Sequence, residues 1–145
     1  MPTCFDVANF FLSKTDPDVG EIISNLKLQK LVYYAQGFAL AVLREPIFRE
    51  RIEAWEHGPV VPDLYHIYKD HKSGAIPPVP SHSADNKFSK DQLELLEDVY
   101  AVYGQFSAWK LRNMTHEEDP WVDAMEDDKI IRPAAMEKFF KTLVD

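Results

Sequence analysis

The chain has 145 residues, a formal net charge of −8 and 46% apolar side chains. This length and apolar content are typical of one globular domain, so we expect residues 1–145 to form a single domain. The charge argues against direct nucleic-acid binding, because that function needs basic surface to neutralise phosphates. No apolar run reaches the eighteen or so residues of a membrane span, so we expect no membrane association.

The N-terminal residues indicate a cytoplasmic protein. The first ten, MPTCFDVANF, lack the basic region and the cleavage site of a secretory signal. Cys4 is the single cysteine and cannot form an internal disulfide, which also fits the cytoplasm. A lone cysteine near a helix start is more often a small apolar filler than a nucleophile.

Helical spacing of apolar residues dominates the first forty-odd positions. Residues 5–12 predict a first helix that ends before Pro17. A long helix is predicted over 25–44, with Ser24 or Asn25 as its cap. Its wide apolar stripe indicates burial on most sides. The stripe contains Leu28, Leu31, Val32, Ala35, Phe38, Ala39 and Val42.

Shorter elements follow the long helix. Residues 46–48 and 51–55 predict a small two-stranded ribbon, because apolar and polar residues alternate there. Pro62 is placed to open a helix over 62–70. Residues 71–88 contain three prolines and few large apolar side chains, which predicts an exposed internal linker.

The second half contains clear helix boundaries. Ser89 and Gln92 have the spacing of a capping box, and Gly104 can end the helix that they begin. Ser107 can cap another helix, and Pro133 can open the last one. The last helix is expected to turn four side chains toward the core: Met136, Phe139, Phe140 and Leu143. We therefore predict a mainly α, compact single-domain bundle of six or seven helices with a small two-stranded β ribbon.

Local motifs for catalysis or metal binding are missing. The five histidines form no H-E-x-x-H motif, and there is no cysteine pair for zinc. The sequence also lacks a nucleophile elbow and a glycine-rich phosphate loop. We therefore expect no catalytic residues, no metal site and no cofactor.

Two polar, aromatic-rich stretches allow two interpretations: EAWEHGPVVP (53–62) and MTHEEDPW (114–121). In a small enzyme, His57 or His116 beside a carboxylate could act as a general base. We favour a structural interpretation, because each residue also has a backbone or packing role. The residues of this structural motif are Gly58, Pro59, Pro62, Asp119, Pro120 and Trp121, and Asp119 is expected to be the N-cap of a helix that Pro120 opens.

Three stretches together go beyond a generic helix pattern. They are NLKLQKLVYYAQGFALA (25–41), PIFRERIEAWEHGPVVPDLYHIYK (46–69) and MTHEEDPWVDA (114–124). In this order and at these separations the chain resembles the Panacea domain, or SocA-like antitoxin family, which includes phage-associated proteins. The resemblance runs from about Val7 to the final helix.

The resemblance implies a mainly helical antitoxin of a bacterial or phage toxin–antitoxin pair. Family members typically neutralise a toxin, often an alarmone-synthetase-like enzyme that blocks translation, by direct protein contact. One member instead delivers its toxin to a protease, which leaves a protease-adaptor role open. Some members carry an extra N-terminal region that binds DNA. This sequence begins almost at the first family helix, so we expect no autorepression by it alone.

A toxin partner would need a contact surface. Two acidic runs, 94–98 and 117–119, could attract a basic toxin. Tyr34 of the long helix is also a candidate contact residue. The alternative is that Tyr34 lies in the core and that the two acidic runs are solvent-exposed faces without a partner. The predicted partner-binding residues are Lys27, Lys30 and Tyr34 on one side of the long helix, Trp55 and His57 beside the turn, and Glu117 and Glu118.

Overall fold

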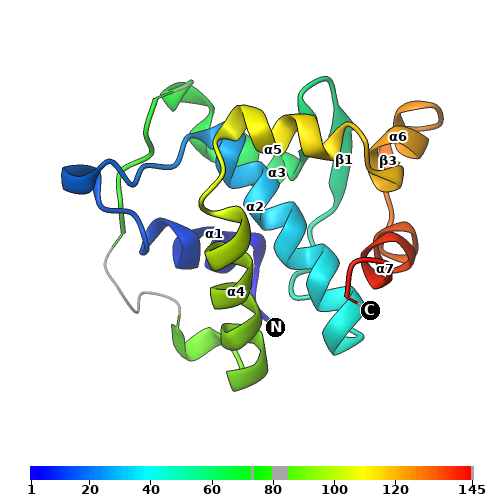
Figure 1. Cartoon of the computed structure of the whole chain (residues 1–145), viewed down its shortest axis with the longest axis horizontal. Helices are drawn as coiled ribbons and strands as arrows, with labels where there is room; N and C mark the ends of the chain where they lie inside the picture. The colour runs from blue at the N-terminus through cyan, green and yellow to red at the C-terminus, as the bar shows by residue number, and fades with distance from the viewer. Residues whose placement is uncertain (73, 80–84, 145) are drawn as a thin grey trace.

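The structure is a computed structural model that describes residues 1–72, 74–79 and 85–144. Within these ranges it contains seven α-helices and one three-stranded antiparallel sheet (Figure 1). The helices are α1 (Cys4–Leu12), α2 (Asn25–Phe38), α3 (Pro62–Tyr68), α4 (Lys90–Tyr103), α5 (Ala108–Thr115), α6 (Asp119–Met125) and α7 (Pro133–Lys141). The strands are β1 (Ile52–Trp55), β2 (Gly58–Val60) and β3 (Ile130–Ile131). The mainly α fold class is confirmed.

Helix α2 is the centre of the domain. Helices α1, α3, α4, α5 and α7 and strand β2 all contact it, and Figure 1 shows it in cyan between them. Every residue from Leu28 to Gly37 is buried, which confirms the expected burial on most sides. The Ser24 hydroxyl accepts a hydrogen bond from the Lys27 amide and caps the helix, as predicted.

The long helix changes its winding near its end. It continues from α2 into a π-helical segment, η2 (Ala39–Leu43), and Arg44 ends it in a left-handed conformation. Gly37 lies against the ring of Phe140, where an added Cβ would overlap the aromatic carbons. Helix α7 therefore packs on the end of α2 at a distance that only glycine permits.

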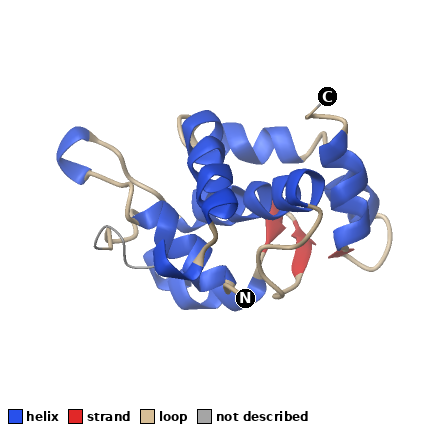
Figure 2. Ribbon diagram, turned by 90° about the horizontal axis from the view of Figure 1, so that it is seen from below, coloured by secondary structure: helices blue, strands red, loops and turns tan. Residues whose placement is uncertain are grey.

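The sheet differs from the predicted ribbon. Strand β1 lies in the middle and pairs with β2 on one side and with β3 on the other (Figure 2). The prediction of a strand at 46–48 is wrong. Ile47 and Phe48 are buried, and their amides donate to the side chain of Gln36 instead of to a strand.

The segment 71–88 is only partly exposed. Ile76 is buried, and its amide donates to the carbonyl oxygen of Ile23 (2.8 Å). Phe88 is also buried and packs edge-on against Phe10. The predicted linker is therefore attached to the core at two points, while its positions 73 and 80–84 lie outside the described residues.

The helix starts in the second half largely follow the prediction. The capping box of Ser89 and Gln92 opens α4, and the Ser107 hydroxyl caps α5. Pro133 is the first residue of α7, as expected. Asp119 is not the N-cap of α6, because Glu118 occupies that backbone position and Asp119 is the first helical residue.

Leu143 does not face the core as expected. It follows the end of α7 and is 46% exposed, whereas Met136 and Phe140 are buried.

No helix within the described ranges has the length and apolar character needed to cross a membrane.

Candidate functional site

The polar side chains of α2 hold the segment that contains the sheet. Gln36 donates to the carbonyl oxygen of Phe48 and accepts from the amide of Ile47. About two turns earlier in α2, the side-chain oxygen of Gln29 accepts a hydrogen bond from the amide of Val61 (2.9 Å). The long helix therefore replaces missing backbone partners on both sides of the β1–β2 hairpin.

The second contact runs between α2 and the start of α6. The hydroxyls of Tyr33 and Tyr34 donate to the two carboxylate oxygens of Glu118, at 3.0 and 2.7 Å. Burial raises the pKa of Glu118 to about 7, although the two hydroxyl hydrogen bonds oppose this shift. Tyr34 also stacks on Tyr103 of α4, with ring centroids 4.2 Å apart. Glu118 thus joins α2 to the start of α6 from a buried position, and Tyr34 extends the connection to α4.

Lys30 crosses the core toward the β1–β2 turn. Its ammonium donates to the carbonyl oxygen of Pro59 (3.1 Å), and the side chain is fully buried. Burial and the charge of Arg112 lower the pKa of Lys30 to about 7. Gly58 has φ +114°, and an added Cβ would lie 2.6 Å from Lys30 Cε and 2.8 Å from Thr115 Oγ1. The turn therefore requires glycine for its backbone and for its close contact with Lys30.

The side chains of His116 and Trp121 in the second stretch also bind backbone. Trp121 Nε1 donates to the carbonyl oxygen of Trp55 (2.8 Å). The ring nitrogens of His116 lie 2.7 Å and 2.8 Å from the carbonyl oxygens of Arg112 and Glu56. His116 also packs on Trp121, with ring centroids 4.0 Å apart. These contacts tie the hairpin to α5 and α6.

The seven predicted partner-binding residues fall into two groups. Lys30, Tyr34 and Glu118 are at most 8% exposed, so the prediction that they form a contact surface is wrong. Within the core, Tyr34 binds Glu118 and Lys30 binds the carbonyl oxygen of Pro59 instead. The other four reach the surface in whole or in part: Lys27, Trp55, His57 and Glu117.

The four surface residues differ in their hydrogen-bond partners within the protein. Lys27 Nζ donates to the carbonyl oxygen of Gly104 (2.6 Å), and Trp55 Nε1 donates to Glu53 (2.9 Å). His57 is exposed and accepts a hydrogen bond from Arg112 through Nδ1 (3.3 Å). Glu117 is exposed. A partner role for these four residues stays a prediction.

The geometry gives little support to an enzyme built on the histidines. In the described part of the chain, neither His57 nor His116 has a carboxylate as a hydrogen-bond partner. The described residues also contain no group of three or more His, Cys, Asp or Glu side chains arranged for a metal ion. Cys4 is buried, which raises the pKa of its thiol to about 12 and disfavours the nucleophilic thiolate.

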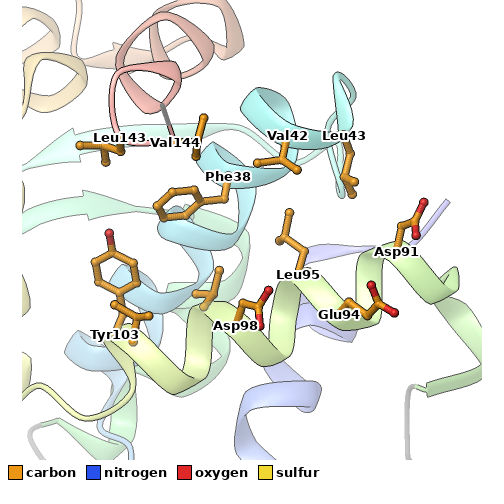
Figure 3. Close-up of a pocket in the computed structure, with 12 residues that line it drawn as sticks. Phe38, Val42, Leu43, Asp91, Glu94, Leu95, Asp98, Tyr103, Leu143 and Val144 are labelled. Carbon is orange, nitrogen blue, oxygen red and sulfur yellow. The ribbon is translucent and has the colours of Figure 1, made fainter.

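A groove lies between α4, η2 and the residues after α7 (Figure 3). It has a volume of about 630 Å³. Its apolar walls come from Phe38, Val42 and Leu43 of the long helix, Leu95, Val99, Val102 and Tyr103 of α4, and Leu143 and Val144. Three carboxylates of α4 line its edge: Asp91, Glu94 and Asp98. No pattern in the sequence predicts this groove, although the acidic run 94–98 lies along it.

Comparison with known families adds to this geometry. Residues 28–122 match the family described as "Antitoxin SocA-like, Panacea domain". The chain belongs to this family. This match confirms the resemblance noted from the sequence. The matched range also contains most of the buried contacts that α2 makes with the hairpin and with Glu118.

A curated Panacea-family relative is "Antitoxin SocA" of Caulobacter vibrioides (strain NA1000 / CB15N). It is 31% identical over 133 residues, which cover 79% of this chain and 66% of the relative's own length. The chain therefore spans slightly less than two thirds of that protein. No solved structure gave a significant match.

The three stretches that carry the Panacea resemblance meet in one buried polar network. Gln29, Lys30 and Gln36 of the first stretch hold the backbone of the second, and Tyr33 and Tyr34 bind Glu118 of the third. The network explains why two glutamines, a lysine and two tyrosines are buried in the long helix. The family pattern in this chain thus describes how the fold is held together.

Proposed function

We propose that this chain is an antitoxin that neutralises a cognate toxin by direct protein–protein binding. The observation that carries the proposal is membership of the Panacea family together with the similarity to a protein named an antitoxin. The geometry supports binding over catalysis, because the two candidate histidines are engaged by Arg112 and by backbone carbonyls. The open apolar groove offers a surface for a partner.

Co-expression tests the proposal. The chain would be expressed in bacteria together with the product of its neighbouring reading frame, and growth would be followed with and without it. An antitoxin restores growth that the neighbour alone arrests, and the two proteins co-purify. Growth arrest that persists despite soluble expression of the chain would contradict the proposal.

The same system separates inhibition from proteolytic delivery. Direct inhibition leaves the toxin at a constant level and works in cells that lack the major energy-dependent proteases. An adaptor lowers the toxin level and needs one of those proteases. We propose inhibition, and a strict protease requirement would favour the adaptor. Loss of translation during toxin expression alone would show that the toxin blocks translation, as the expected alarmone-synthetase-like class does.

A further inference from the structure

Helix α4 carries two parallel stripes along the groove. Asp91, Glu94 and Asp98 are spaced by three and four residues and form an acidic stripe. Leu95, Val99 and Val102 have the same spacing and form an apolar stripe beside it, in which Leu95 and Val99 are already buried and Val102 is exposed. From residue 91 to residue 102 the stripes extend over roughly 16 Å of helix. Figure 3 shows the carboxylates in a row along α4, with Leu95 directed toward the side chains of the opposite wall.

The wall opposite α4 is apolar and only partly covered. Val42 of η2 is 53% exposed, and Leu143 and Val144 after α7 are 46% and 41% exposed. Val102 on the α4 side is 50% exposed. Exposed apolar side chains that gather along one groove mark a binding surface more often than single ones scattered over the protein.

The charged side chains along the groove all have the same sign. All charged residues that line it in the described part of the chain are acidic. None of the three carboxylates takes part in a salt bridge within the described ranges, whereas nearby Glu97 pairs with Lys14. An occupant that packed on Val102 and the exposed opposite wall would bring its own side chains beside these carboxylates. Cationic side chains are favoured there, and acidic ones are repelled.

We propose that this groove binds a cationic amphipathic helix of the partner protein. The helix would place apolar side chains, spaced by three and four residues, against the exposed Val102 and against the exposed opposite wall of Val42, Leu143 and Val144. Lysine or arginine side chains on its adjacent stripe would face Asp91, Glu94 and Asp98. The proposal rests on the proposed function, because the partner is the toxin. A second copy of this chain fits less well, since its net charge is also negative.

A designed peptide tests the chemistry of the groove apart from any toxin. The probe is a helix of about four turns with a leucine stripe and an adjacent lysine stripe, and its control has glutamate in place of lysine. In NMR titrations of the full chain, the lysine peptide should shift the amide signals of Val99 and Val102, and the glutamate peptide should not. Equal binding of both peptides, or shifts elsewhere on the chain, would overturn the proposal.

Two groove variants and one matched control sharpen the test. The triple variant Asp91→Asn, Glu94→Gln, Asp98→Asn and the variant Val102→Asp should each weaken peptide binding at least about tenfold, mostly at low salt for the triple variant. Asp70→Asn, Asp123→Asn, Glu126→Gln removes three exposed charges outside the groove and should change the affinity less than about twofold. All three are expected to keep the wild-type melting temperature, because the substituted side chains are exposed. Unchanged peptide affinity in both groove variants would contradict the proposal.

The toxin assay distinguishes failure of this inference from failure of the proposed function. Under the proposal, wild type and the control triple variant restore growth and the groove variants do not. If wild type and the groove variants restore growth equally, the groove is not the contact and the antitoxin function stands. If wild type binds the lysine peptide but fails to restore growth, the groove chemistry stands and the antitoxin function fails. Dimers in analytical ultracentrifugation that Val102→Asp abolishes would make a second copy the occupant and overturn the proposal.

Discussion

Glu118 performs two structural tasks with one residue. Its backbone is the N-cap of α6, and its carboxylate accepts both tyrosine hydroxyls from α2 instead of capping α6. A carboxylate with two donors can stay charged in the core, but burial still favours its protonated form. Glu118 is therefore a buried group that titrates near neutral pH.

This titration makes stability depend on pH in a defined direction. The pKa of Glu118 is about 7 in the folded chain and 4.5 for an ordinary glutamate, so the folded state binds more protons between these values. The free energy of unfolding that this group contributes is fully present below pH 4.5 and is lost as the pH rises through about 7. Urea unfolding at several pH values should show this slope in wild type and in Glu117→Gln, but not in Glu118→Gln. A slope of the same size in Glu118→Gln would contradict the role of the buried carboxylate.

Gly58 is the second residue with a sharp prediction. Gly58→Ala combines an unfavourable positive φ with contacts of 2.6 Å and 2.8 Å to Lys30 and Thr115. Gly20 also has a positive φ, +79°, but an added Cβ would meet nothing within 4 Å. Gly20→Ala should therefore cost roughly 1 kcal/mol and Gly58→Ala clearly more, about 2–4 kcal/mol. Thermal melting of both variants checks this order, and equal losses would show that the close contact has no effect.

At the scale of elements, α2 organises the fold through its polar side chains as well as its apolar ones. Its buried glutamines substitute for strand partners that the short sheet cannot supply. Losing one of them leaves buried backbone groups without a partner, which costs more than losing an exposed hydrogen bond.

Gln36→Ala should lower the free energy of unfolding by about 2–4 kcal/mol, because it leaves the Ile47 amide and the Phe48 carbonyl without a partner. Gln105→Ala is the matched control, since Gln105 is exposed and donates one hydrogen bond to Val102. Its cost should be under about 0.5 kcal/mol. Urea midpoints at an unchanged m value measure both. Similar midpoint shifts for the two variants would mean that the Gln36 contacts do not hold the hairpin.

The sequence predicted elements where local patterns decide them. The apolar spacing of α1 and α2 and the capping box of α4 are local, and the expected helices at these positions are present. Strand β2 was missed because its residues Gly58 and Pro59 are poor strand formers, and the prediction used 46–48 instead. Strand β3 has two residues and pairs with a strand more than seventy positions earlier, so no local pattern marks it.

The candidate site was harder to predict for the same reason. Lys30 and Tyr34 stand on the side of α2 opposite the strongest apolar stripe, which suggested an exposed face. Their partners Pro59 and Glu118 come from distant parts of the chain, so burial could not be inferred from spacing. The groove likewise combines α4 with η2 and the residues after α7, and the acidic run was its one visible trace.

At the scale of the whole molecule, charge and surface suit recognition of a protein. The net charge of −8 favours a basic partner, and the acidic edge of the groove is where that attraction would be strongest. The buried contacts of α2 support this surface, and His57 and His116 are bound to Arg112 and to backbone carbonyls.

Glu117 tests the long-range part of this attraction. It is exposed and lies outside the groove, so Glu117→Lys should slow association with the toxin about two- to fivefold at low salt and leave dissociation unchanged. Stopped-flow mixing at two salt concentrations measures both rates. A change confined to the dissociation rate would place Glu117 inside the interface instead.

The central claim is that this chain neutralises a toxin by binding it. The most direct measurement uses the purified product of the neighbouring reading frame in a cell-free translation reaction that lacks energy-dependent proteases. Adding the purified chain should restore translation in proportion to its amount, reach a plateau at a fixed molar ratio and leave the toxin intact. Translation that stays blocked at a large excess of folded chain, while the two proteins fail to bind, would contradict the claim.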